Sequence, residues 1–132
     1  MQIFKAGERP TVRANSAYFT GTVWQDPVVS APEPARVAAV TVAFEPGART
    51  NWHTHPLGQT LHVLSGAGLI QVWGEAQREI RAGDTVWIPP GVKHWHGAGP
   101  ETAMTHLAIH EQQDGSAADW LEPVTDEQYK AG

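Results

Sequence analysis

Residues 47–66 read GARTNWHTHPLGQTLHVLSG, and this stretch gives the strongest indication of the fold. His53 and His55 are two residues apart, so on a β-strand their imidazole rings project from the same face. Pro56 and Gly58 force a bend after them, and Gln59 follows on a segment that we expect to run back alongside. Two imidazoles and one amide oxygen that converge in this way can hold one metal ion.

Residues 83–94 read GDTVWIPPGVKH and supply a further candidate ligand, His94. The turn Pro89-Pro90-Gly91 ends the preceding strand and can swing His94 inward. The candidate ligands include no thiolate, and on a six-coordinate ion they leave positions open for a substrate, as catalytic sites do. Such a set suits Mn²⁺, Fe²⁺, Ni²⁺, Co²⁺ or Zn²⁺. Its members are His53, His55, Gln59 and His94.

The rest of the chain has the composition of an all-β protein. Its 132 residues suffice for one domain, and 13 glycines and 10 prolines separate short runs rich in Val, Ile, Thr and Trp. Turns at such regular spacing are typical of a sandwich or barrel. We expect a single domain over residues 1–132, with an N-terminal strand or arm and loop over 1–36, a core barrel over 37–110 and a C-terminal tail over 111–132.

Alternating apolar residues predict which strands line the interior. One such strand is expected at Val37–Glu45 and another at Thr102–His110. Their inward residues are Val40, Val42 and Phe44 in the first, and Met104, His106, Ala108 and His110 in the second. Other strands are expected at Ala17–Trp24, Thr50–His55, Gln59–Leu64, Leu69–Trp73, Gln77–Arg81, Thr85–Ile88 and His94–Gly97. In the tail, Thr125-Asp126-Glu127-Gln128 has the sequence of a capping box and predicts a short helix.

Charge and composition exclude several classes of partner. The formal net charge is −5, the pI is about 5.7 and the basic residues are scattered, which argues against nucleic acid or an anionic membrane. No segment approaches the ~18 apolar residues of a membrane span, and the N-terminus lacks the pattern of a signal peptide. Because the chain also has no cysteine, we expect a soluble cytoplasmic protein whose partner is a small-molecule substrate.

Both histidine-containing stretches resemble the motifs of the cupin superfamily. The pattern Gly47-x5-His53-x-His55-x3-Gln59-x6-Gly66 is similar to the first motif, and Gly83-x5-Pro89-x-Gly91-x2-His94 is similar to the second. Two positions depart: Gln59 replaces the usual glutamate, and Ala98 replaces an asparagine that often ends the second motif. The resemblance implies an all-β, single-domain β-barrel of jelly-roll type. It implies no single function, because cupins range from storage proteins to dioxygenases and isomerases.

A narrower resemblance, to the bacterial manganese-dependent cupin hydroxynitrile lyases, runs nearly from end to end and includes the unusual glutamine. In that family the metal ion sits at the positions that match His53, His55, Gln59 and His94, and the position that matches His106 acts in catalysis. The resemblance implies Mn²⁺ as cofactor and aromatic cyanohydrins such as (R)-mandelonitrile as substrates. The similar segments are 19–23 (FTGTV), 44–50 (FEPGART), 52–60 (WHTHPLGQT), 93–98 (KHWHGA), 102–109 (TAMTHLAI) and 124–129 (VTDEQY).

Cyanohydrin cleavage assigns chemical roles to the histidines. The metal ion would act as a Lewis acid, and His106 is the candidate general base because its imidazole titrates near neutral pH and its strand face points inward. Alternatively, His106 only orients a ligand or a water. His96 either faces the same cavity, as the base or as the acid for cyanide, or lies at the cavity mouth. His62 alternates away from Gln59 and is expected outside the site.

The remaining candidates would contact the substrate. Thr50 donates a hydrogen bond to the substrate or to cyanide, or it is an ordinary strand threonine. The apolar stripe on the first interior strand forms a wall for an aromatic ring, or it is plain core; its members are Val40, Val42 and Phe44. His110 lines the far edge of the cavity, or it is exposed near the strand end.

Two other functions remain open at this point. One is a manganese or iron cupin oxygenase that cleaves C=C bonds or flavonols, since three-histidine cupin sites perform such chemistry. The other is a non-enzymatic small-molecule-binding cupin. By analogy with small cupins that pair through an N-terminal strand, we expect a homodimer or a homotetramer.

Overall fold

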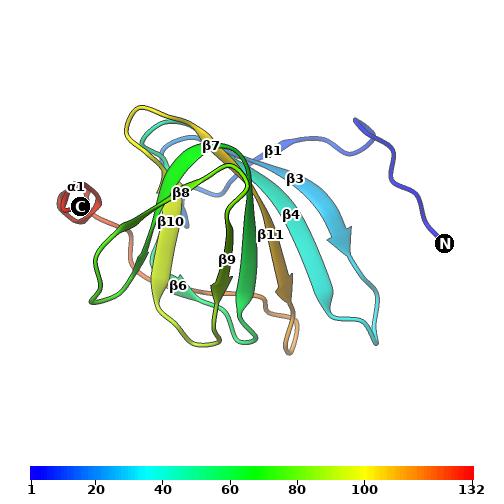
Figure 1. The fold of residues 1–132 in the computed structure, drawn as a ribbon. Coiled ribbons are helices and arrows are strands. Elements are labelled where there is room, and N and C mark those ends of the chain that lie inside the picture. Colours follow the sequence, from blue (N-terminus) through cyan, green and yellow to red (C-terminus); the bar gives the residue numbers. More distant parts are fainter.

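The computed structural model describes residues 1–132, which form an antiparallel sheet and one short helix (Figure 1). The prediction of an all-β fold with a short C-terminal helix is confirmed. No helix of the chain is long and apolar enough to cross a membrane. The strands are β1 (Val12–Arg13), β2 (Phe19–Thr20), β3 (Val23–Ser30), β4 (Val37–Phe44), β5 (Arg49–Thr50), β6 (His53–Thr54), β7 (Gln59–Val72), β8 (Arg78–Arg81), β9 (Thr85–Ile88), β10 (His94–Ala98), β11 (Met104–Glu111) and β12 (Asp119–Trp120), and the helix is α1 (Asp126–Lys130).

The sheet curls so that its two halves face each other, as Figure 1 shows. The strand order is β1-β3-β4-β11-β7-β10-β5-β2, and all neighbours are antiparallel. Strand β7 belongs to both halves, because its first part pairs with β11 and its second part pairs with β10. The concave side between the halves carries the inward residues of the interior strands, and this is where the candidate site lies.

Strand β7 corrects one prediction. We expected a strand to end at Ser65-Gly66, but a single strand of 14 residues continues through both. The ladder with β11 shifts register at this point, between Thr105 and His106, and Gly66 has a φ of +77°. A bulge with glycine in the left-handed region bends a strand without ending it, so the glycine marks the corner of the curled sheet and not a turn.

Two further strand boundaries differ from the predictions. The expected strand Thr50–His55 is split into β5 and β6, because Trp52 donates its backbone N–H to Glu122 in the C-terminal segment. The expected strand Ala17–Trp24 is split as well, by Gly21 at a φ of +83°. Its second part, β3, continues through Pro27, where the register with β4 is irregular. Proline is tolerated there because it lies beyond the short pairing with β1 and removes no donor that the ladder needs.

Apolar side chains form two clusters, one on each side of the sheet half that contains β5 and β10. The larger cluster fills the concave side and includes Val42, Phe44, Leu61 and Met104. The smaller cluster lies under the C-terminal segment and consists of Trp52, Trp95, Val124 and Tyr129. Since Trp52 and Trp95 alternate with His53, His94 and His96 along their strands, burial of the tryptophans on one side directs the histidines to the other.

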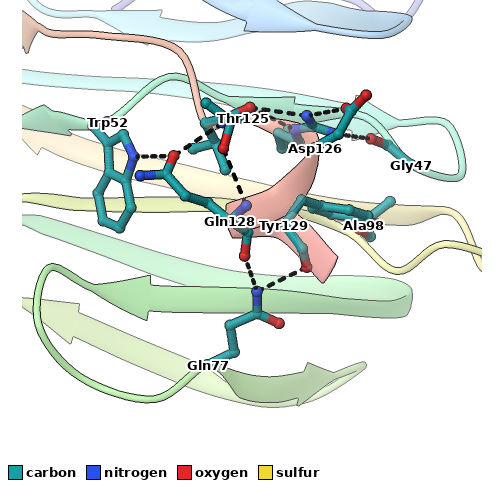
Figure 2. A network of polar contacts seen from close by, with 10 residues as sticks. Gly47, Trp52, Gln77, Ala98, Thr125, Asp126, Gln128 and Tyr129 are labelled. Atoms are coloured by element: carbon teal, nitrogen blue, oxygen red, sulfur yellow. Dashed lines mark hydrogen bonds and ion pairs between the residues drawn. The ribbon is translucent and has the colours of Figure 1, made fainter. Parts of the chain in front are cut away.

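The C-terminal helix is held against the outer side of the sheet by a network of polar contacts, shown in Figure 2. The predicted capping box is confirmed: Thr125 Oγ1 accepts from Gln128 N, and Gln128 Oε1 accepts from Thr125 N. Arg49, whose side chain is buried, donates to Val124 O at 2.8 Å and to Asp126 Oδ1 at 2.8 Å. The Tyr129 hydroxyl donates to Ala98 O at 2.7 Å.

Replacement of Arg49 by methionine is expected to destabilise the protein by about 1–3 kcal/mol, because the buried carbonyl of Val124 loses its donor. Asp126→Asn removes the charge on the other side of the same ion pair. It should change the free energy of unfolding little, since the Asp126 side chain is 80% exposed and exposed ion pairs are weak. Urea unfolding measures the free energy of unfolding of both variants. Equal losses of stability in the two would contradict the view that the Arg49–Val124 hydrogen bond makes the larger contribution.

Candidate metal centre and substrate pocket

The concave side of the sheet contains a cavity of about 330 Å³. It collects ten of the residues singled out from the sequence: Val40, Val42, Phe44, Thr50, His53, His55, Gln59, His96, His106 and His110. His94 lies directly behind this lining, with its ring centroid 4.3 Å from that of His53. A larger hollow of about 540 Å³ opens elsewhere, between residues 31–36 and 112–115, and no histidine lines it.

Three of the candidate ligands have the same hydrogen-bonding pattern. In each ring Nδ1 faces a backbone carbonyl oxygen, which can only accept, so Nδ1 carries the proton and Nε2 carries the lone pair. This is the second contact that metal-bound histidines usually make. The pairs are His53 Nδ1 with Asn51 O at 2.8 Å, His55 Nδ1 with Ala117 O at 2.7 Å, and His94 Nδ1 with Val92 O at 2.9 Å.

Several ligand atoms at this place are buried and make no hydrogen bond. They include His55 Nε2, His94 Nε2 and Gln59 Oε1. The rings of His55 and His94 lie 5.4 Å apart, and each lies within 5 Å of the ring of His53. Buried polar atoms without partners are rare in folded proteins and call for an explanation. A divalent cation shared by these atoms provides one, and the residues therefore fit a metal ion.

His96 competes for a place in the ligand set. Ring nitrogens of His53, His94 and His96 all lie within 4.8 Å of one another, so this trio is the tighter cluster. However, His96 Nδ1 lies 3.1 Å from His106 Nε2 and not against a backbone carbonyl. Only His53, His55 and His94 share the carbonyl contact, so they are the candidate metal ligands that this contact favours, whereas His96 pairs with His106.

Burial keeps the site histidines neutral. It lowers the pKa of His94 and of His106 to about 4, and it lowers the pKa of His53 and His96 well below the usual range, helped by the neighbouring histidines. Burial is also the main cause that lowers the pKa values of His55 and His110. At pH 7 the rings therefore present lone pairs and no positive charge, which suits metal binding. The expectation that His106 titrates near neutral pH is not met: burial keeps its ring neutral and able to accept a proton, but makes it a weaker base than a free imidazole.

Stability of the metal-free protein is expected to fall as the pH drops from 6.5 towards 4. The pKa of the His106 imidazole is 6.5 in the unfolded chain, and burial lowers this pKa to about 4 in the folded protein. In this range the unfolded state therefore binds more protons, and acid favours it. The contribution of neutral His106 to the free energy of unfolding is fully present above pH 6.5 and is lost as the pH falls towards 4. Urea midpoints at pH 7.5, 6 and 5 measure it, and His106→Phe should flatten the dependence. An unchanged slope in that variant would contradict it.

The apolar wall faces the histidine pair. The Phe44 ring lies 5.3 Å from that of His106 and 5.9 Å from that of His96, in an edge contact with the latter. Thr50 is buried, and its Oγ1 accepts from the backbone N–H of His96 at 3.2 Å. Its hydroxyl proton therefore remains free to donate into the cavity. His110, half-buried at the far edge, stacks against His55 at 6.1 Å.

Residues outside the predicted set also line the cavity, and most come from the C-terminal tail. Trp120 packs its ring against that of the candidate ligand His53, with centroids 4.7 Å apart, and Ala117 supplies the carbonyl for His55. Phe19 and Gln25 contribute from the N-terminal strands. A tryptophan in an otherwise polar tail was a signal that could have indicated this role. The carbonyl of Ala117 left no sequence signal.

Comparison with known proteins supports the same interpretation. A cupin domain matches residues 40–110. The chain is 58% identical over 130 residues to an (R)-mandelonitrile lyase from Granulicella tundricola, covering 98% of this chain and 99% of that protein. It is 31% identical over 86 residues to a 3-hydroxyanthranilate 3,4-dioxygenase from Paraburkholderia phytofirmans, covering 63% of this chain and 49% of that protein.

A solved structure extends the likeness to the whole fold. A cupin-like protein from Thermotoga maritima superposes with a TM-score of 0.85 at 41% sequence identity, covering 98% of this chain and 96% of that one. The resemblance of the two histidine motifs is thereby confirmed, together with the jelly-roll architecture that it implied.

Proposed function

The chain belongs to the cupin family, and we propose that within it the protein is a metal-dependent hydroxynitrile lyase. Its substrates would be aromatic cyanohydrins such as (R)-mandelonitrile, which it cleaves to the aldehyde and HCN or forms from them. The observation that carries the proposal is the cavity in which His53 and His55, with His94 directly behind them, lie beside the buried His96–His106 pair. The near full-length likeness to an (R)-mandelonitrile lyase supports the same substrate class.

The residues that would hold the metal ion are His53, His55 and His94 through Nε2 and Gln59 through Oε1. A divalent ion, Mn²⁺ in our proposal, would lower the pKa of the substrate hydroxyl and stabilise the oxygen as the C–C bond breaks. All four side chains are uncharged, so they leave the full charge of the ion available for that role. This favours acid–base chemistry over activation of dioxygen.

His106 is assigned as the general base. Burial keeps its imidazole neutral at pH 7, because it lowers the pKa to about 4. When Nε2 carries the proton shared with His96 Nδ1, 3.1 Å away, Nδ1 of His106 holds the lone pair. That atom is buried and makes no hydrogen bond. We assign it to accept the hydroxyl proton of the cyanohydrin, a task that general bases accelerate by about 10²–10⁴-fold.

The proton then returns to the leaving group. The C–C bond electrons depart with cyanide, and the carbonyl of the aldehyde forms at the deprotonated oxygen. The imidazolium of His106 protonates cyanide, directly or through the ring of His96. Thr50 can donate its hydroxyl proton to cyanide or to the substrate oxygen. The apolar wall of Val40, Val42 and Phe44 excludes water and contacts the aromatic ring.

Turnover without oxygen tests the proposal. Protein loaded with Mn²⁺ is incubated with racemic mandelonitrile under nitrogen, and benzaldehyde and cyanide are measured together, with metal-free protein as the control. We expect equal amounts of both products, only with metal, and depletion of the (R)-enantiomer. No release above the control would contradict the lyase.

A second candidate is a cupin oxygenase, favoured by the likeness to a 3-hydroxyanthranilate 3,4-dioxygenase over 63% of the chain. It predicts uptake of oxygen with an alkene, a flavonol or an aromatic aminophenol such as 3-hydroxyanthranilate, and no cyanide release under nitrogen. A binding protein without catalysis predicts instead that a ligand binds equally well after metal removal. The buried lone pairs of His55 and His94 favour a metal-dependent protein over the latter.

Gln59→Glu is expected to lower lyase turnover about tenfold while the metal content stays the same, because a carboxylate reduces the positive charge that acts on the substrate oxygen. A tenfold loss corresponds to about 1.4 kcal/mol in the activation free energy of the reaction. Metal content is measured by elemental analysis beside the kinetics. Equal or faster turnover at full metal content would show that glutamine and glutamate are interchangeable at this position.

A further inference from the structure

Residues 115–120 run along one side of the cavity and form one of its walls; we call this segment the strap. Five of the 18 lining residues belong to it: Gly115, Ser116, Ala117, Ala118 and Trp120. The strap lies beyond residues 40–110, which the cupin domain matches. The ligand motifs are therefore explained by the family, and the strap is not.

Hydrogen bonds fix the strap at both ends. At its start, Gln113 and Ser116 exchange two backbone hydrogen bonds of 2.9 and 3.0 Å. At its end, β12 pairs with β6, and Leu121 N donates to Trp52 O at 2.9 Å. A segment held in this way presents a defined surface to the cavity and does not behave as a free loop end.

The strap also contacts the candidate ligands directly. The carbonyl of Ala117 accepts from His55 Nδ1 at 2.7 Å. The ring of Trp120 lies against those of His53 and Tyr18, at centroid distances of 4.7 and 4.8 Å. The distance between the strap and the candidate metal ligands is therefore set by these two contacts, and the strap side chains that line the cavity decide how much room remains.

Those side chains are small. Ser116, Ala117 and Ala118 carry no more than one heavy atom beyond Cβ, and they share the cavity with the apolar residues Val42 and Phe44. The cavity of about 330 Å³ is near the lower end of ligand pockets, which span about 300–1,000 Å³. A larger side chain on the strap would take up the space that an aromatic ring needs.

We infer that the strap is the specificity-determining wall of the site, and that alanine at position 118 admits an aromatic ring beside the metal centre. The inference rests on the proposed function for the nature of the substrate. Ala118 is the position to test, because it is half-buried and its carbonyl bonds only to Ser116 Oγ at 3.1 Å. The carbonyl of Ala117, by contrast, holds His55.

The test compares Ala118→Leu with a matched control, Ala82→Leu, at an exposed alanine in the turn before β9. Values of kcat/KM are measured with Mn²⁺ for mandelonitrile and for the small cyanohydrin of acetaldehyde. We expect Ala118→Leu to lose at least about tenfold on mandelonitrile and less than about threefold on the small substrate, as extra carbons in a tight pocket do. The control should change neither. An equal loss on both substrates, or unchanged values, would overturn the inference.

A binding readout separates failure of this inference from failure of the proposed function. If the unaltered protein cleaves no cyanohydrin, the lyase proposal fails, and benzyl alcohol binding is followed instead through the indole N–H signal of Trp120. Ala118→Leu should then weaken binding at least about tenfold, and unchanged binding overturns the strap assignment. If Ala118→Leu does not fold, Ala118→Gly should favour the larger naphthyl cyanohydrin over mandelonitrile, and unaltered preference overturns it.

Discussion

His106→Phe is expected to lower kcat for mandelonitrile by about 10²–10⁴-fold, the usual contribution of a general base, while Mn²⁺ content stays the same. Phenylalanine fills a similar volume in the buried position but accepts no proton. The side chain lies against Phe44, so an aromatic replacement preserves the packing. Steady-state kinetics measure kcat, and metal analysis on the same sample measures the Mn²⁺ content.

The matched control is His62→Phe. His62 lies on β7 opposite Leu107 of β11, faces away from the cavity and bonds to Thr85 Oγ1 at 2.8 Å. This variant should retain full turnover. If His106→Phe retained activity within about threefold, which is well below the contribution of a general base, His106 would only orient its neighbours, and the base would have to be sought at His96.

His94→Ala is expected to remove both metal binding and lyase activity. Loss of a residue that merely orients a ligand costs about 10–100-fold in metal affinity, so loss of a ligand atom should cost more than about 100-fold. Titration of the metal-free variant with Mn²⁺ measures the affinity, and the mandelonitrile assay measures the activity. Turnover should fall to the level of the metal-free protein.

His62→Ala serves as the control for this variant, because it removes an imidazole outside the cavity. It should bind metal and turn over as the unaltered protein does. Should His94→Ala bind Mn²⁺ normally, the unpartnered Nε2 of His94 would need another explanation, and the metal centre would lie elsewhere.

Local sequence patterns predicted the inner surface of the sheet well. The alternation in Val37–Glu45 and Thr102–His110 corresponds to β4 and β11, which pair with His106 opposite Val42. Alternation succeeds there because each strand has one buried face, and the period of two then fixes which side chains point inward. The capping box at Thr125 is equally local, and it is present in the structure.

Features that depend on distant contacts were not predictable in the same way. Ser65-Gly66 has the composition of a turn, but a glycine bulge inside a long strand has the same local signature, and only the pairing of β7 with both β11 and β10 distinguishes them. The strap is a second case. The contact between His55 and Ala117 joins residues 62 apart in the sequence. It involves a backbone carbonyl, and because every residue has one, the residue type gives no indication of the contact.

The sequence motifs and the distances between side chains indicate different sets of metal ligands. The motifs indicate His53, His55, Gln59 and His94, whereas proximity alone selects His53, His94 and His96. The carbonyl contacts of His53, His55 and His94 favour the first set, because they fix the tautomer that exposes Nε2. His96 pairs with His106 instead, which is why we propose a role in proton transfer for it.

A crystal structure of the Mn²⁺-loaded protein with anomalous scattering tests most directly whether these four side chains bind one metal ion. We predict one ion per chain, bound by Nε2 of His53, His55 and His94 and by Oε1 of Gln59, with at least one coordination position open towards the cavity. An ion held by His53, His94 and His96, or an anomalous map without a peak among these residues, would contradict it.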